Sequence, residues 1–503
     1  MLRSLTEVAT TDLLLTLPIA VPLATAAGYL VPIRRPVSGW AGLVSPAAIL
    51  TSGAVLAARV PGNGSMTAYG HLLRADALTS WMLLVVGAVA ALAVGASPAY
   101  LAGERTAGRA DDRAARRYYV LVHAFLGAMA AAVLAENLGV LWVAIEATTV
   151  VTAFLVGHRH TRASIEAAWK YVVICSVGIA LAFLGTVLIY YAARQAQISE
   201  SQALDWPTLA AHAGALNPDV TRLGIALIVL GFGAKAGLVP LHAWLPDAHS
   251  QAPAPVSALM SGVLLAVAFT AILRYKVIAD AALGTGYLRI LLVGAALLTL
   301  ALAAGLLLGQ RDYKRMLAYS SMEHMSLIAL GTAVGSPLAI AAVLLHIAGH
   351  GLVKSVAFCS AGHVLQLRHT TRIENVRSLL AGAPALGVAF GLAVLALLGL
   401  PPFSLFASEL GIARAGFAAG LGWPTAAVFV LVLVAFAALA LRAARMVLGA
   451  APDAPGTPAV PLRIGAAAGT PLTTGLLACA ALGVTTGPLT SLLHDAAAII
   501  GGH

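Results

Sequence analysis

The chain has 503 residues, of which 60% are hydrophobic and only 10% are charged, and its mean hydropathy is +0.92. A soluble protein of this length needs a surface that is about a quarter charged, so the composition excludes a water-soluble fold and predicts an all-α polytopic membrane protein. The net charge of +10 does not indicate nucleic acid as a partner. The basic residues stand in short runs between apolar segments, where membrane topology accounts for them.

Fourteen apolar stretches long enough to cross a bilayer as helices follow one another along the chain. They are 11–31, 40–60, 77–97, 118–135, 138–157, 171–192, 222–240, 253–273, 287–308, 316–333, 337–366, 384–411, 424–448 and 470–487. The first is interrupted by Pro18 and Pro22 and has acidic flanks, so we expect it to be retained rather than cleaved as a signal peptide. No hydrophilic interruption is long enough for an independent domain, and 1–503 is expected to form a single membrane domain.

Lysine and arginine are distributed unevenly over the loops. Nineteen of the 30 lie in loops that follow odd-numbered segments, and nine lie at the termini or in loops that follow even-numbered segments. Basic loops generally face the cytoplasm. The distribution therefore predicts a multi-pass protein of the cell (inner) membrane with both termini outside.

Glycine and proline interrupt two of the segments. The seventh contains Gly237-Leu238-Val239-Pro240, and the twelfth contains Gly399-Leu400-Pro401-Pro402. Paired broken helices in the two halves of a transporter are the best sequence indication of its transport site. Coincidence remains an alternative in a chain with 49 Gly and 24 Pro.

Four charged side chains fall inside or beside apolar segments, namely Glu146, Lys235, Lys354 and Glu409. A charge at mid-membrane costs about 2.5 to 3.5 kcal/mol on insertion scales, so each is expected to be paired, hydrated or functional. How tightly a buried lysine holds its proton depends on whether a carboxylate lies beside it, so opening and closing of a Glu146–Lys235 pair is expected to gate a proton. The alternative is that the four form static ion pairs or extend to the membrane surface.

The eleventh segment carries a polar stripe. His346, His350 and Lys354 recur every four residues, which places them on one helix face, and imidazole titrates in a range useful for a proton relay. Two other interpretations stay open. The histidines pack and hydrogen-bond across helices, or His346 and His350 bind zinc, which is disfavoured because no acidic or sulfur ligand accompanies them. No metal site is predicted.

Five further polar residues are candidates for a channel or its mouth. They are His242, Asp247, His249, Glu323 and His324. The first three follow the break in the seventh segment and are expected to form either an opening to one aqueous side or a rigid loop. The last two follow Lys314 and Arg315, begin a further segment, and are candidates for an interfacial position or for a relay.

No motif for a redox cofactor is present in the sequence. Cys175, Cys359 and Cys479 each stand alone in an apolar stretch, and no glycine-rich loop opens a nucleotide-binding βαβ unit. We therefore expect no cofactor on this chain, and we expect iron–sulfur, nickel–iron, flavin or quinone chemistry only on partner subunits. No Ser/His/Asp triad or catalytic carboxylate pair points to hydrolysis.

The run from Gly231 to Gly262, GFGAKAGLVPLHAWLPDAHSQAPAPVSALMSG, resembles the signature of the antiporter-like proton-translocating subunits. This family is shared by respiratory complex I, energy-converting membrane hydrogenases and Mrp-type cation/proton antiporters. Supporting matches lie at 141–149, 166–171 and 317–325 and in the stripe of the eleventh segment. The resemblance covers roughly residues 70 to 445, and it looks closest to the hydrogenase-4 component F or formate hydrogenlyase branch.

The resemblance implies an architecture and roles. It implies about 14 transmembrane helices, with inverted five-helix repeats at 118–273 (helices 4–8) and 287–448 (helices 9–13), and with helices 7 and 12 broken. It also implies that Glu146 is the modulating carboxylate, Lys235 the central proton-bearing lysine and Glu409 the exit-side group.

One departure from the family concerns the eighth segment. Many members carry a Lys or His there, about 31 residues after the lysine of segment seven, where this chain has Ala266. The path to Glu409 would then rely on His346, His350, Lys354 and water, or the second half-channel does not conduct. Members with a long lateral helix extend well beyond fourteen segments, and such an arm is not expected here.

The sequence thus predicts a proton-translocating membrane subunit of a multi-subunit, redox-driven complex, of the hydrogenase-4, formate hydrogenlyase or NADH-quinone oxidoreductase type. Its partners would be other membrane and peripheral subunits and the lipid bilayer, and any oxidoreductase activity would belong to the complex. The alternative is a subunit of an Mrp-type cation/proton antiporter that performs no redox work. A third possibility is a structural membrane scaffold.

Overall fold

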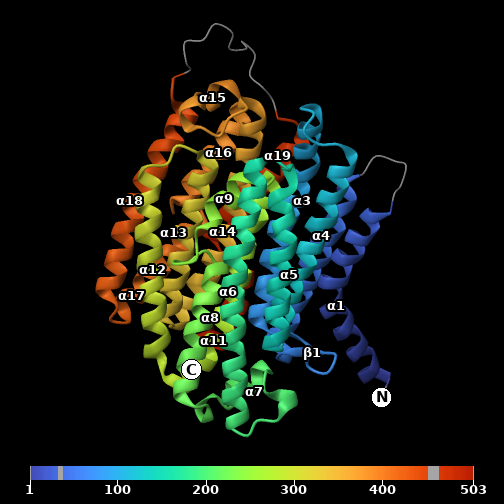
Figure 1. The fold of residues 1–503 in the computed structure, drawn as a ribbon, viewed down its shortest axis with the longest axis vertical. Helices are drawn as coiled ribbons and strands as arrows, with labels where there is room; N and C mark the ends of the chain where they lie inside the picture. The colour runs from blue at the N-terminus through green and yellow to red at the C-terminus, as the bar shows by residue number, and fades with distance from the viewer. Residues whose placement is uncertain (1, 32–37, 451–463, 502–503) are drawn as a thin grey trace.

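The computed structural model describes residues 2–31, 38–450 and 464–501, which form an elongated bundle of helices (Figure 1). The helices are α1 (Leu2–Leu30), α2 (Val44–Asn63), α3 (Ala77–Thr106), α4 (Asp112–Leu134), α5 (Leu138–Val156), α6 (Arg162–Gln195), α7 (Trp206–Ala211), α8 (Pro218–Lys235), α9 (Trp244–Gln251), α10 (Ala254–Leu259), α11 (Leu265–Leu283), α12 (Thr285–Leu308), α13 (Tyr313–Val334), α14 (Pro337–Arg368), α15 (Leu379–Gly382), α16 (Pro384–Leu397), α17 (Ser404–Ala418), α18 (Gly422–Leu448), α19 (Ala466–Val484) and α20 (Thr490–Gly501). The strands β1 (Met66–Ala68) and β2 (Leu73–Ala75) form a small antiparallel hairpin in which Met66 pairs with Ala75.

Eleven helical spans in the described residues are long and apolar enough to cross a membrane. They are Thr10–Leu30, Gly39–Gly62, Ala77–Thr106, Asp112–Leu134, Leu138–Arg159, Arg162–Gln195, Ala254–Leu283, Thr285–Leu308, Pro337–Arg368, Gly422–Leu448 and Ala466–Val484. The prediction of an all-helical polytopic membrane protein is therefore confirmed. Predicted segments seven, ten and twelve are not among the eleven spans. The seventh and twelfth are interrupted, and the tenth, which corresponds to α13, has 22 residues but is more polar than the eleven.

Both interruptions fall where glycine and proline predict them. Helix α8 ends at Lys235 and α9 begins at Trp244, while α16 ends at Leu397 and α17 begins at Ser404. Within the breaks, Gly237 has a φ of +80° and Gly399 a φ of +63°. This left-handed conformation is easily adopted by glycine and is unfavourable for residues that carry a side chain. The sequence therefore leaves two helix ends inside the bundle.

Two helical stretches form the centre of the bundle. The first comprises α10, a π-helical turn at Met260–Leu264 and α11, and every residue from Ala254 to Lys276 is buried; the second is α14, which is buried from Ala339 to Gly362 except at Ala341. The two stretches approach each other closely at Gly262 and Gly351: a Cβ added to Gly262 would lie only 2.9 Å from the carbonyl oxygen of Gly351. The polar stripe of the eleventh predicted segment lies on α14 and is thus enclosed by protein.

A buried ion pair fastens the start of α3 to α11. Asp76 caps α3 by accepting a hydrogen bond from the Thr79 backbone, and it also accepts bonds of 2.6 and 2.9 Å from the Arg274 guanidinium. That guanidinium lies over the ring of Trp206, 4.5 Å from its centroid. Burial is the largest single influence on the pKa of the Asp76 carboxyl and raises it, but the charge and hydrogen bonds of Arg274, the Thr79 backbone hydrogen bond and the charge of Arg74 together outweigh it, so that the pKa lies at about 2.

We expect Asp76→Asn to lower the free energy of unfolding by about 3 to 5 kcal/mol, because the buried Arg274 charge would lose its counter-charge. Since the folded-state pKa lies below the usual 3.8, the pair stabilises the fold above about pH 4, and this stabilisation is lost as the pH falls toward 2. Unfolding in detergent, measured as a function of pH, tests this. The exposed Asp219, which pairs with Arg222 at 2.9 Å, provides the control, since Asp219→Asn should change stability little. An equal loss in both variants would contradict the assignment.

Candidate functional site

Lys235 is the last residue of α8 and is completely buried. Its Nζ donates hydrogen bonds to the hydroxyl of Tyr171, at 2.6 Å, and to that of Thr149, at 2.7 Å. Its position at the C-terminal end of a helix also favours a positive charge. The break that ends α8 thus presents a lysine, held only by neutral hydroxyls, inside the bundle.

Glu146 lies one turn before Thr149 on α5 and is half-buried. Its Oε2 has no hydrogen-bond partner in the described chain, and it lines an open groove of about 530 Å³ between α5 and α6. Thr149 lines the same groove and also accepts a hydrogen bond from Lys235, so this residue connects the groove to the buried lysine. Glu146 and Lys235 form no ion pair within 4.0 Å, so the structure holds this pair in a separated arrangement.

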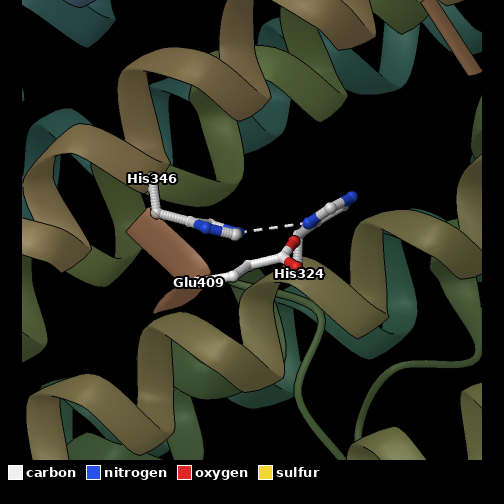
Figure 2. A group of neighbouring side chains, drawn as sticks. All are labelled: His324, His346 and Glu409. Atoms are coloured by element: carbon white, nitrogen blue, oxygen red, sulfur yellow. Dashed lines mark hydrogen bonds between the residues drawn. The ribbon is translucent and has the colours of Figure 1, made fainter. Parts of the chain in front are cut away.

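A second cluster joins α13, α14 and α17. His324 Nδ1 lies 3.1 Å from His346 Nε2 (Figure 2). The His324 ring centroid is 5.1 Å from those of both His346 and His350. His346 Nδ1 lies 2.9 Å from the Ser408 hydroxyl. The histidines of the predicted stripe therefore lie in one connected group, with His324 between them.

Lys354 ends this group on α14. Its Nζ donates to the Leu317 carbonyl, at 2.7 Å, and to the Ser320 hydroxyl, at 2.5 Å, and the side chain is completely buried. Like Lys235, it is held by neutral oxygen atoms, so the two buried lysines have the same kind of environment on different helices.

Glu409 lies on α17, just beyond the second break. A Cβ on Gly399 would approach the Glu409 Oε2 to 2.4 Å, so the absence of a side chain at Gly399 makes room for this carboxylate. One oxygen of Glu409 lies within 4.8 Å of ring nitrogens of His324 and His346, and Figure 2 shows the three side chains converging.

The interpretation of the four charges as static ion pairs does not hold in this conformation, because Glu146, Lys235, Lys354 and Glu409 form no ion pair within 4.0 Å in the described ranges. Extension to the surface does not hold for the two lysines, which are completely buried, whereas Glu146 and Glu409 are partly exposed. The structure therefore holds four charged side chains without fixed counter-charges.

Of the two positions left open for Glu323 and His324, the structure does not favour the interfacial one. Both are buried in the middle of α13, which already begins at Tyr313. Lys314, in the first turn of α13, is nevertheless buried, and it donates to the carbonyls of Ser250 and Ala252, at 2.8 and 2.9 Å. Backbone carbonyls therefore satisfy this charge inside the protein.

The segment after the first break is held rigidly. Asp247 pairs with Lys170, at 3.0 Å, and with Arg315, and so connects α9 to α6 and α13. His249 is completely buried, and its Nδ1 bonds to the Leu245 carbonyl at 2.8 Å. His242 is half-buried beside Pro240. Of the two interpretations left open for this stretch, these contacts favour the rigid loop.

Sequence reasoning did not assign the neutral partners of the two lysines. Tyr171, Thr149 and Ser320 come from helices other than that of the lysine they hold. Their only sequence signal was that they fall within the stretches 141–149, 166–171 and 317–325 that carry the family resemblance. Ala266 is buried in α11 and contributes no titratable group.

Comparisons with known proteins place the chain in a family. Residues 135–436 match the family described as NADH:quinone oxidoreductase/Mrp antiporter, TM. A hydrogenase-4 component F homolog of Methylacidiphilum infernorum is 40% identical over 325 residues, which cover 64% of this chain and 68% of that protein. NADH-quinone oxidoreductase subunit N of Desulforudis audaxviator is 31% identical over 437 residues, which cover 83% of this chain and 82% of that protein.

The fold is also similar to that of a solved structure. A chain of the membrane-bound sulfane sulfur reductase, an archaeal respiratory membrane complex, superposes with a TM-score of 0.84 at 24% sequence identity. The superposition covers 98% of this chain and 97% of the other. The two chains therefore share one arrangement of helices.

The contact between Gly399 and Glu409 makes a testable prediction. Gly399→Ala adds a Cβ at a left-handed position and against the carboxylate, whereas Gly420→Ala adds one at a φ of +77° with no atom within 4 Å. Both should lose about 1 to 2 kcal/mol of unfolding free energy from backbone strain, and Gly399→Ala should lose more because Glu409 must move. In a Glu409→Ala background the two losses should become equal. An excess for Gly399→Ala that persists there would refute the proposed contact.

Proposed function

Because the chain belongs to the NADH:quinone oxidoreductase/Mrp antiporter membrane family, we propose that it is the proton-translocating membrane subunit of a multi-subunit, redox-driven complex. The complex would be of the hydrogenase-4 or NADH-quinone oxidoreductase type. The observation that carries this proposal is the set of buried titratable groups without fixed counter-charges in the centre of the bundle. Such groups are costly in a membrane and typically mark an ion path.

The first half of the path is proposed to centre on Lys235. Glu146, one turn from Thr149, is the carboxylate that approaches and leaves it. Approach of the two charges to about 4 Å is worth about 4 kcal/mol at an effective dielectric near 20, enough to decide whether the lysine holds or releases its proton. The separated arrangement seen in the structure would be one of the two states.

The second half is proposed to run along α13 and α14 to Glu409. From Lys354 the order is His350, His324 and His346, since His324 contacts both other rings. The distance between Glu409 and the imidazoles exceeds 4.0 Å, which one water molecule can bridge.

Neutral hydroxyls are proposed to replace the basic group that the eighth segment lacks at Ala266. Ser261 lies in the π-helical turn and its hydroxyl is 2.7 Å from that of Ser321 on α13. Ser321 in turn neighbours Ser320, which holds Lys354. With water, this pair offers a connection from the first half toward Lys354.

We further propose fourteen crossings, formed by the eleven spans together with α8–α9, α13 and α16–α17. Inverted repeats would then cover 118–273 and 287–448, each with one broken helix. An even number of crossings agrees with α1 beginning and α20 ending at the same end of the bundle (Figure 1). The distribution of lysine and arginine favours placing that end outside the cytoplasm; loops 32–37 and 451–463, which hold three of the 19 counted residues, lie outside the described ranges.

Redox cofactors are proposed to belong to partner subunits, since the sequence offers no motif for iron–sulfur, nickel–iron, flavin or nucleotide binding. The other candidate is a subunit of a cation/proton antiporter, which the description of the matching family also covers. Sodium-dependent pH changes in vesicles without an electron donor would favour that candidate.

Lys235→Ala and Glu146→Gln should each reduce proton pumping by about 100-fold or more, because each removes a group that holds or releases the transferred proton. Proton uptake is measured in inverted vesicles that carry the intact complex, together with electron transfer in the same sample. Glu374→Gln is the matched control. This exposed carboxylate lies between α14 and α15, 3.6 Å from the exposed Arg372. Full pumping in both test variants would show that the proposed roles are incorrect.

A further inference from the structure

We propose that His324, His346 and Glu409 form a binding site for one divalent transition-metal ion of the zinc class. The sequence suggested only a weak pair of His346 and His350, without an acidic ligand. The structure differs from that suggestion in two ways. The carboxylate of Glu409 lies near His346, and the second histidine of the group is His324 instead of His350. Three helices, α13, α14 and α17, then contribute one ligand each.

The distances between the donor atoms suit a small cation. His324 Nδ1 and His346 Nε2 are 3.1 Å apart. Two ligands on a tetrahedral zinc ion, with bonds of about 2.0 to 2.1 Å, lie roughly 3.3 to 3.4 Å apart. A Glu409 oxygen lies within 4.8 Å of a ring nitrogen of each histidine, yet no ion pair within 4.0 Å joins it to either ring. A movement of about 1 Å of this flexible side chain would complete a three-ligand site with an open fourth position.

One ligand is already oriented by its surroundings. His346 Nδ1 lies 2.9 Å from the Ser408 hydroxyl. When Nδ1 donates its proton to that hydroxyl, Nε2 presents its lone pair toward His324. Hydrogen bonds of this kind fix the ring and tautomer of metal-binding histidines. On His324, the other ring nitrogen, Nε2, is buried and has no partner in the described chain, so the ring is free to present Nδ1 to an ion.

Charge favours a cation at this position. Glu409 forms no ion pair with any described lysine or arginine, and Lys354, two turns from His346 along α14, is engaged by Leu317 and Ser320. A bound dication would supply the counter-charge that the carboxylate lacks. Two imidazoles and one carboxylate suit zinc and related transition metals, whereas magnesium and calcium prefer oxygen ligands throughout.

The site is tested on the full chain in lipid nanodiscs, purified with an affinity tag that contains no histidine. Bound Zn²⁺ is measured after equilibrium dialysis, and the visible spectrum of bound Co²⁺ reports nitrogen and oxygen ligands. The wild-type chain should bind one ion that His346→Ala and Glu409→Gln lose, with dissociation constants at least about 100-fold higher. Ser408→Ala should weaken binding by about 10- to 100-fold. His350→Ala, which removes a neighbouring imidazole outside the trio, should bind within about threefold of wild type.

Three results would overturn the site: no ion bound by the wild-type chain, equal binding by wild type, His346→Ala and Glu409→Gln, or loss in His350→Ala with retention in Glu409→Gln. Circular dichroism of each variant establishes that the helices are intact.

A consequence for transport rests on the proposed function: Zn²⁺ should inhibit pumping by the intact complex, and Ser408→Ala should raise the half-inhibitory concentration by about 10- to 100-fold. Binding without inhibition would support the site and contradict the second half-path. Absence of binding would remove the site and leave the path intact.

Discussion

A polar side chain deep in this bundle can take its partners only from the protein or from water, because lipid supplies none. The lysines at the centre meet this requirement with neutral oxygen atoms: Lys235 uses two hydroxyls, and Lys354 uses a carbonyl and a hydroxyl. Near the ends of the helices, opposite charges meet it instead, as between Asp76 and Arg274. The central helices α10, α11 and α14 can therefore be enclosed and still carry charge.

This division separates groups that fasten the bundle from groups that can change partners. Glu104 is bound by Arg109 at 3.0 Å and by Arg159 at 3.2 Å, and breaking both pairs would leave the buried Glu104 carboxylate without a counter-charge. A lysine bonded to hydroxyls exchanges one neutral partner for another, at the smaller cost of single hydrogen bonds. Static ion pairs at the ends thus hold the frame in which the central charges of Lys235 and Lys354 rearrange.

The sequence allowed the helical class, the positions of the breaks and the central charges to be predicted, because these depend on hydropathy, glycine and proline, all of which act locally. It did not allow the partners on neighbouring helices to be predicted, because periodicity describes one helix face and not the register between two helices. Tyr171 and Ser320 were missed for that reason. The burial of Lys314 was missed because a charge normally ends an apolar segment outside the protein core, whereas here, in the first turn of α13, two backbone carbonyls satisfy it.

The two broken helices place charges in different ways. At the first break the carbonyl end of α8 itself favours the cation of Lys235. At the second, the missing side chain of Gly399 leaves the space that the Glu409 carboxylate occupies. That carboxylate has two imidazoles nearby but no ion pair, so it can accept a proton, a water molecule or a metal ion. Suitability for a relay and susceptibility to a metal ion therefore have one physical cause: a relay group must be free to change partners, and a group with that freedom cannot exclude a competing cation.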